Sequence, residues 1–259
     1  MRVAGEQHKR LYDKRARPLA GIAIFENKLF WRGAKNKVEG GPNIVVANHP
    51  GAHKDIGVLI SLYTRQLFFT ANKELFSYEE MNMLAEKYLG LWFRKAGPGV
   101  KANMMFFLKP FTHIAVRYIS SRIARVGTIP VDIRGGDNSE AKRVMEQYLL
   151  EDKAVVLLQY NNRHAPTKYD PLNKEIHEFR YGAPSLAYKM FIKHGVNVPV
   201  TPISLEGTYH PFRPFGKVKV NIGEPMYITD YLDVAEPVAA FKEALEQRVV
   251  ELYNEFKRA

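Results

Sequence analysis

One stretch, Asn43 to Leu59, constrains the fold of this chain more than any other. It reads NIVVANHPGAHKDIGVL, and its β-branched run, Ile44 to Val46, lies between Gly40-Gly41-Pro42 and Pro50-Gly51. An apolar run of this length bounded by turn residues predicts a buried strand. The end of that strand delivers His49 into a loop, and open α/β sheets place their ligand sites at such carboxyl ends.

Asp55 comes soon after His49 and opens a second apolar segment, Ile56 to Leu62, as an Asp at a helix N-cap would. A histidine side chain titrates near neutrality, so it can take a proton from a hydroxyl and return it within one turnover. A carboxylate on the other ring nitrogen fixes the tautomer and stabilises the imidazolium. The two residues therefore suggest a general base and its orienting carboxylate, although a loop histidine beside an ordinary N-cap explains the segment equally well.

Composition narrows the classes of partner. The chain has 259 residues, of which 46% are hydrophobic and 25% charged, enough for one large domain or two small ones. Lysine and arginine number 38 against 27 acids, a net charge of +11, which favours an anionic partner. The chain lacks a dense basic run and a nucleic-acid-binding motif, so we expect phosphate esters or an anionic membrane surface and no nucleic acid. The absence of cysteine excludes disulfides, zinc-thiolate sites and a thiol nucleophile, and it fits a reducing cytosol.

Strand patterns and helix patterns alternate along the chain, which predicts one α/β domain with a largely parallel sheet flanked by helices. We place this domain at residues 41–259. Residues 1–40 form a basic and aromatic N-terminal arm, which suits either an interfacial membrane anchor or a surface arm packed on the domain.

Residues 77–126 are unusually aromatic. From Phe111 to Ile123 the apolar positions recur at helical spacing, while Lys109 and Arg117 lie on another face. Cations interrupt every apolar run before it approaches the ~20 residues of a spanning helix. We therefore expect a peripheral or monotopic protein on the cytoplasmic side of a membrane, with an ordinary core-facing helix as the alternative.

The sequence Asn48-His49, followed by a loop, Asp55 and an apolar helix, resembles the first motif of the glycerolipid acyltransferases. This family includes the glycerol-3-phosphate and 1-acylglycerol-3-phosphate acyltransferases, in which the histidine is the general base on the acceptor hydroxyl. The family has four residues between His and Asp, whereas this chain has five, Pro50 to Lys54. Gly51 is able to absorb the additional residue in a tight or bulged turn. His53 stands closer to Asp55 in sequence and is an alternative partner for it.

Two later segments continue the resemblance. Lys73-Glu74-Leu75 follows the next predicted strand, as a similar tripeptide does in the family. Lys73 would serve a substrate phosphate there, and a solvated helix start is the alternative. Residues 127–134 resemble the second family block, in which Arg134, one position late, would contact the acceptor phosphate.

The third family block, Phe-Pro-Glu-Gly-Thr-Arg, is degenerate in this chain. The corresponding residues, Leu158 to Arg163, read LQYNNR, so only the arginine is retained and Tyr160 replaces the glutamate. Arg163 keeps a planar charged fork suited to phosphate or carboxylate. Asn161 and Asn162 would donate hydrogen bonds beside it.

The resemblance spans about residues 40–226 with its blocks in family order. It implies a membrane-surface acyltransferase of phospholipid metabolism that moves a fatty acyl group from acyl-CoA, or from an acyl-carrier protein, to a hydroxyl of a glycerol phosphate or lysophospholipid-like acceptor. The thioester is a co-substrate, and no cofactor or metal is implied. Two alternatives remain, a lipid-binding member of the same fold without catalysis and a metal-dependent hydrolase using His49, His53 and Asp55. A serine hydrolase would need a Gly-x-Ser-x-Gly elbow, which the chain lacks.

Overall fold

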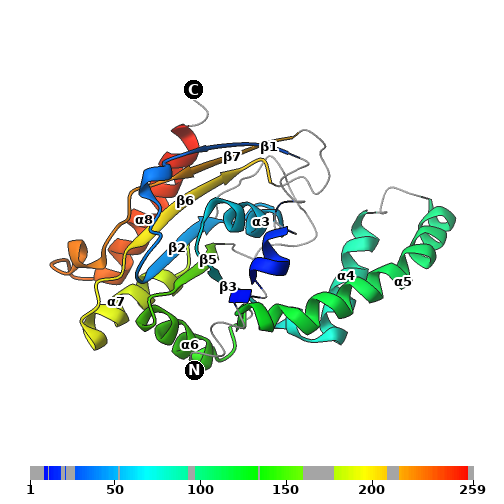
Figure 1. The fold of residues 1–259 in the computed structure, drawn as a ribbon, viewed down its shortest axis with the longest axis horizontal. Helices are drawn as coiled ribbons and strands as arrows, with labels where there is room; N and C mark the ends of the chain where they lie inside the picture. The colour runs from blue at the N-terminus through cyan, green and yellow to red at the C-terminus, as the bar shows by residue number, and fades with distance from the viewer. Residues whose placement is uncertain are drawn as a thin grey trace.

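A seven-stranded sheet forms the centre of the molecule (Figure 1). The computed structural model describes residues 9–10, 12–18, 21, 27–51, 53–92, 97–133, 135–159, 178–208 and 216–255. The strands are β1 (Asn27–Arg32), β2 (Asn43–Asn48), β3 (Leu67–Asn72), β4 (Ile129–Val131), β5 (Ala154–Gln159), β6 (Val200–Glu206) and β7 (Gly216–Ile222). Their order across the sheet is β1-β7-β6-β2-β5-β3-β4, and every neighbouring pair is parallel except β6 and β7. The predicted largely parallel α/β sheet is confirmed, with β2 in its middle.

Helices cover both faces of the sheet. The longer ones are α3 (His53–Leu62), α4 (Tyr78–Trp92), α5 (Pro98–Ile123), α6 (Ser139–Leu150), α7 (Gly182–His194) and α8 (Pro237–Glu255). Short helical turns are η1 (Tyr12–Ala16), η2 (Ala34–Asn36), η3 (Lys73–Phe76), η4 (Ala124–Val126) and η6 (Ile228–Tyr231). Ile44 and Val46 of β2 pack in a core with α6, α7 and α8, whereas Val45 and Ala47 pack in a second core with α3. Because both faces of β2 are buried, its residues Ile44 to Ala47 are all apolar and do not alternate with polar ones.

Both ends of the chain contribute to this framework. Residues 27–32, which the sequence placed in the N-terminal arm, form β1 and pair in parallel with β7 at one edge of the sheet. The division into an arm and a domain stays a prediction. Towards the other end of the chain, α8 buries Phe241, Leu245, Val249 and Leu252 along one face.

The aromatic segment forms a helical hairpin. Helices α4 and α5 pack on each other and project beyond the sheet on its β3 side (Figure 1). Phe111 and Ile114, which the helical pattern placed on one apolar face, are 71% and 69% exposed. The core-facing alternative is therefore wrong for these two side chains, because α5 packs along α4 and leaves this face outside.

Candidate active site

The predicted site residues follow strand ends that share one edge of the sheet. β2 ends at Asn48 beside Gln159 of β5, and β3 ends at Asn72 beside Val131 of β4. Parallel strands bring their carboxyl ends to the same edge, where α/β proteins bind ligands. The residues that come after these four ends are His49, Lys73, Arg134, Asn161, Asn162 and Arg163.

His49 and Asp55 are hydrogen-bonded partners. The distance from His49 Nδ1 to Asp55 Oδ2 is 2.8 Å; the Asp55 side chain is fully buried, and that of His49 is 23% exposed. An ionised carboxylate accepts from Nδ1–H, and this tautomer makes Nε2 the basic nitrogen. The geometry is that of a base with its orienting carboxylate, and the catalytic roles of the two residues stay predictions.

The N-cap assignment of Asp55 is wrong. Helix α3 begins at His53, so Asp55 lies within the first helical turn. Its Oδ2 accepts the backbone N–H of Gly51 at 2.7 Å. The carboxylate therefore ties the loop to the helix through a donor four residues earlier, while the same oxygen contacts His49. A negative side chain in a first helical turn is also favoured by the helix dipole.

Steric crowding by a neighbouring residue requires glycine at position 51. Its φ is not in the left-handed region, so the turn does not depend on glycine's conformational freedom. A Cβ at this position would instead lie 2.4 Å from both Cβ and the backbone oxygen of Thr208. Thr208 is fully buried. The preceding residue, Gly207, must be glycine, because its φ is +83° and an added Cβ would lie 2.2 Å from the backbone oxygen of Lys217. The longer loop fits because residue 51 has no side chain where Thr208 packs.

Asn48 extends the sheet beyond its backbone ladder. Its side chain is buried, donates from Nδ2 to Leu205 O at 2.8 Å, and accepts at Oδ1 from Leu205 N–H at 2.7 Å. These two hydrogen bonds fix the end of β2 against β6 immediately before His49. Sequence reasoning noted the Asn-His pair and gave Asn48 no role, and it missed Thr208 altogether. A buried polar residue closing an apolar strand was the available indication for Asn48.

Lys73 forms an ion pair with Asp132, with its Nζ 2.6 Å from Oδ2. The lysine is 56% exposed and the aspartate 11%, so the pair links η3 to the segment after β4 at the rim of the site. A phosphate role for Lys73 stays a prediction, in which a ligand would compete with Asp132.

The remaining predicted residues lie outside the described part of the chain. These are Arg134, Asn161, Asn162, Arg163 and the side chain of His53. Among the residues that are described, no group of three His, Cys, Asp or Glu side chains is placed to hold a metal ion.

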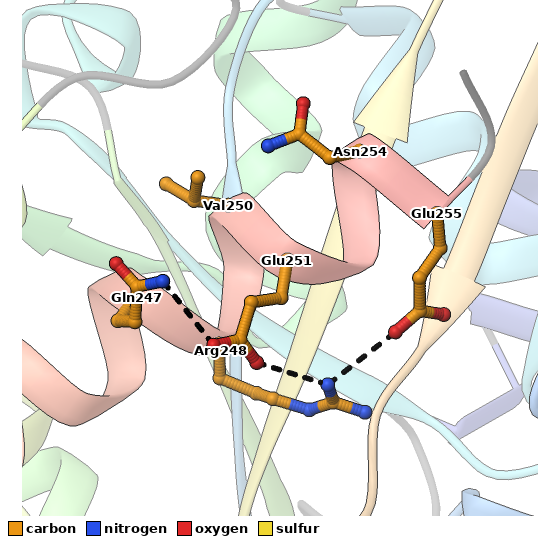
Figure 2. Close-up of a pocket in the computed structure, with 6 residues that line it drawn as sticks. All are labelled: Gln247, Arg248, Val250, Glu251, Asn254 and Glu255. Carbon is orange, nitrogen blue, oxygen red and sulfur yellow. Dashed lines mark hydrogen bonds and ion pairs between the residues drawn. The ribbon is translucent and has the colours of Figure 1, made fainter. Parts of the chain in front are cut away.

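A surface hollow on α8 lies apart from these residues (Figure 2). Arg248 Nη1 donates to Glu251 Oε2 at 3.2 Å and to Glu255 Oε1 at 3.4 Å, and Gln247 Nε2 donates to Glu251 Oε1 at 3.2 Å. The charges of this hollow thus bind one another, and it contains none of the predicted site residues.

Comparison with known proteins finds a likeness to a solved structure. No family model matches the chain, and no curated protein matches it. The structure is similar to the crystal structure of the 1-acyl-sn-glycerophosphate (LPA) acyltransferase, PlsC, from Thermotoga maritima, with a TM-score of 0.47 and 20% sequence identity. That match covers 96% of this chain and 80% of the other. Structural overlap at this level carries no information about the chemistry of this chain.

Proposed function

We propose that this chain is an acyltransferase that moves a fatty acyl group from a thioester donor to a hydroxyl of a phosphate-bearing, lipid-like acceptor. The main support is the 2.8 Å contact between His49 and the buried Asp55 at the carboxyl edge of the sheet. A base held in one tautomer can activate an acceptor hydroxyl directly, without a covalent acyl-enzyme. The order of the sequence blocks supports the same reaction.

In this mechanism His49 Nε2 removes the proton from the acceptor hydroxyl. The oxygen attacks the thioester carbonyl carbon and forms a tetrahedral intermediate. Asp55 stabilises the imidazolium through Nδ1–H. When the intermediate collapses, the C–S bond breaks, and the departing thiolate receives the proton from the imidazolium. The products are the acylated acceptor and the free thiol.

The charge of the chain supports anionic substrates. The net charge of +11 favours the phosphates of coenzyme A, the acidic surface of an acyl-carrier protein, or a phosphate-bearing acceptor such as a glycerol phosphate or lysophospholipid. Lys73, Arg134 and Arg163 are the proposed phosphate contacts. A lysophospholipid acceptor and an acylated product both reside in a bilayer, so we place the enzyme on the cytoplasmic surface of a membrane.

The test measures thiol release from acyl-CoA and from acyl-carrier protein, with and without glycerol 3-phosphate or a lysophospholipid. His49→Ala should lower the chemical step by at least ~10²-fold without unfolding the protein, because a positioned base contributes that much. His53→Ala is the matched control and should have a much smaller effect.

Other outcomes would favour another function. Equal losses in the two histidine variants, or a larger loss for His53→Ala, would remove His49 as the base. Lipid binding without any thiol release would indicate the non-catalytic alternative. Release of free fatty acid that a chelator abolishes would indicate a metal-dependent hydrolase.

A further inference from the structure

Helix α5 presents a row of large apolar side chains to the outside. Phe106, Phe107, Phe111 and Ile114 are between 69% and 75% exposed, and Tyr118 is 40% exposed. Positions 107, 111, 114 and 118 are separated by four, three and four residues, so these side chains form one stripe along the helix. A continuous exposed apolar stripe of this kind marks a surface that is covered in use.

The opposite side of α5 is already occupied by α4. His113 Nδ1 lies 2.5 Å from Tyr78 Oη, and Lys109 Nζ lies 4.0 Å from Glu86 Oε1. Val116, at 3% exposed, is buried on this side. The hairpin is thus held together on one face, and the stripe lies exposed on the other face.

The charge of α5 identifies that partner as an anionic bilayer. Its 26 residues include no acid and four cations, Lys101, Lys109, Arg117 and Arg122. Aromatic side chains flanked by cations insert into the headgroup region of anionic membranes. A second copy of the same face would instead oppose two sets of cations. Among the described residues, no helix combines the length and the apolar composition that a membrane span needs.

The hairpin starts beside the candidate site. Lys73 follows the end of β3 and His49 follows the end of β2, with β5 between these two strands. Two strand spacings amount to about 10 Å, so the two residues leave the sheet close together. Helix α4 begins at Tyr78, directly after η3. The helical hairpin that would contact the membrane therefore begins at the same edge of the sheet as His49.

We propose that the outward stripe of α5 (Phe107, Phe111, Ile114 and Tyr118) docks the protein on an anionic bilayer. Binding itself does not require catalysis, whereas delivery of a bilayer-resident acceptor to His49 rests on the proposed function.

Flotation with vesicles of phosphatidylglycerol and phosphatidylcholine tests the docking. The double variant Phe107→Ser/Phe111→Ser should lower the partition coefficient by about 10²-fold, since each phenylalanine contributes about tenfold. The double variant Leu150→Ser/Ile192→Ser is the matched control, because these side chains are 49% and 60% exposed on α6 and α7. This control should bind as the wild type does, and circular dichroism should show both variants folded.

Charge and catalysis supply independent readouts. Arg117→Gln should weaken binding to the anionic vesicles more than Lys217→Gln does, a control that removes an exposed lysine of β7. High salt should remove this difference, because it screens surface charges. His49→Ala should float like the wild type, because it changes the proposed base and leaves the stripe intact. Absence of thiol release by the wild type with intact flotation would refute the acyltransferase and leave the docking in place.

Three results would overturn the docking surface. They are failure of the wild type to bind anionic vesicles at low salt, wild-type binding by the Phe107→Ser/Phe111→Ser variant, and conversion of a solution dimer to monomers by that variant. The last result would assign the stripe to self-association.

Discussion

Replacing Gly51 with alanine should damage both stability and the candidate site. The new Cβ would lie 2.4 Å from two atoms of Thr208, one of which is a backbone oxygen that cannot rotate away. Carbon atoms at an optimal contact lie about 3.5 Å or more apart. The backbone at residue 51 or 208 must therefore move by roughly 1 Å.

The size of the effect follows from the two interactions that this movement disturbs. Overpacking at a buried position costs about 1–3 kcal/mol. The hydrogen bond from Gly51 N–H to the buried carboxylate of Asp55, now 2.7 Å long, is worth about 1.5–3 kcal/mol if it is lost. If both effects act in full, we expect the free energy of unfolding to fall by about 2.5–6 kcal/mol. A displacement of ~1 Å of the loop that holds His49 and Asp55 should also lower kcat by about 10²-fold.

Urea unfolding gives the stability, and thiol release gives the rate. Gly40→Ala is the matched control, because nothing lies within 4 Å of a Cβ at that position and its φ is not left-handed. This control should leave stability unchanged or raise it by about 0.4–1 kcal/mol. If Gly51→Ala matches Gly40→Ala in both measurements, the contact with Thr208 does not determine the loop. Lower stability with unchanged turnover would show that Thr208 moves and the His49 loop does not.

Three further predictions concern the same edge of the sheet. Asp55→Asn should lower turnover by at least ~10²-fold, because the imidazolium loses its counter-charge, and near-normal turnover in this variant would remove Asp55 from the mechanism. Asn48→Ala should lower the free energy of unfolding by about 2–4 kcal/mol, since two buried backbone groups of Leu205 lose their partner; unchanged urea unfolding would contradict this. Arg163→Lys and Arg134→Lys should each weaken the specificity constant for phosphate-bearing acceptors by roughly one to two decades and that for the acyl donor less, and equal effects on phosphate-free acceptors would place the phosphate site elsewhere.

The sequence alone determined the α/β class and the position of His49. The β-branched run before Asn48 is apolar on both faces because β2 is covered by helices on both sides, and the glycines and proline around it mark its ends. Local pattern is sufficient here, since an unbroken apolar run and the turn residues that bound it are read from neighbouring residues.

The tertiary structure decided what each pattern contacts. The periodicity of α5 identified an apolar stripe, but whether a stripe faces a core or the outside depends on which elements pack beside it. Gly51 is constrained by Thr208, and Asn48 binds Leu205, partners more than 150 residues away that only the β2–β6 pairing brings close. Such contacts are set by the topology of the sheet, so no local pattern near His49 contains them.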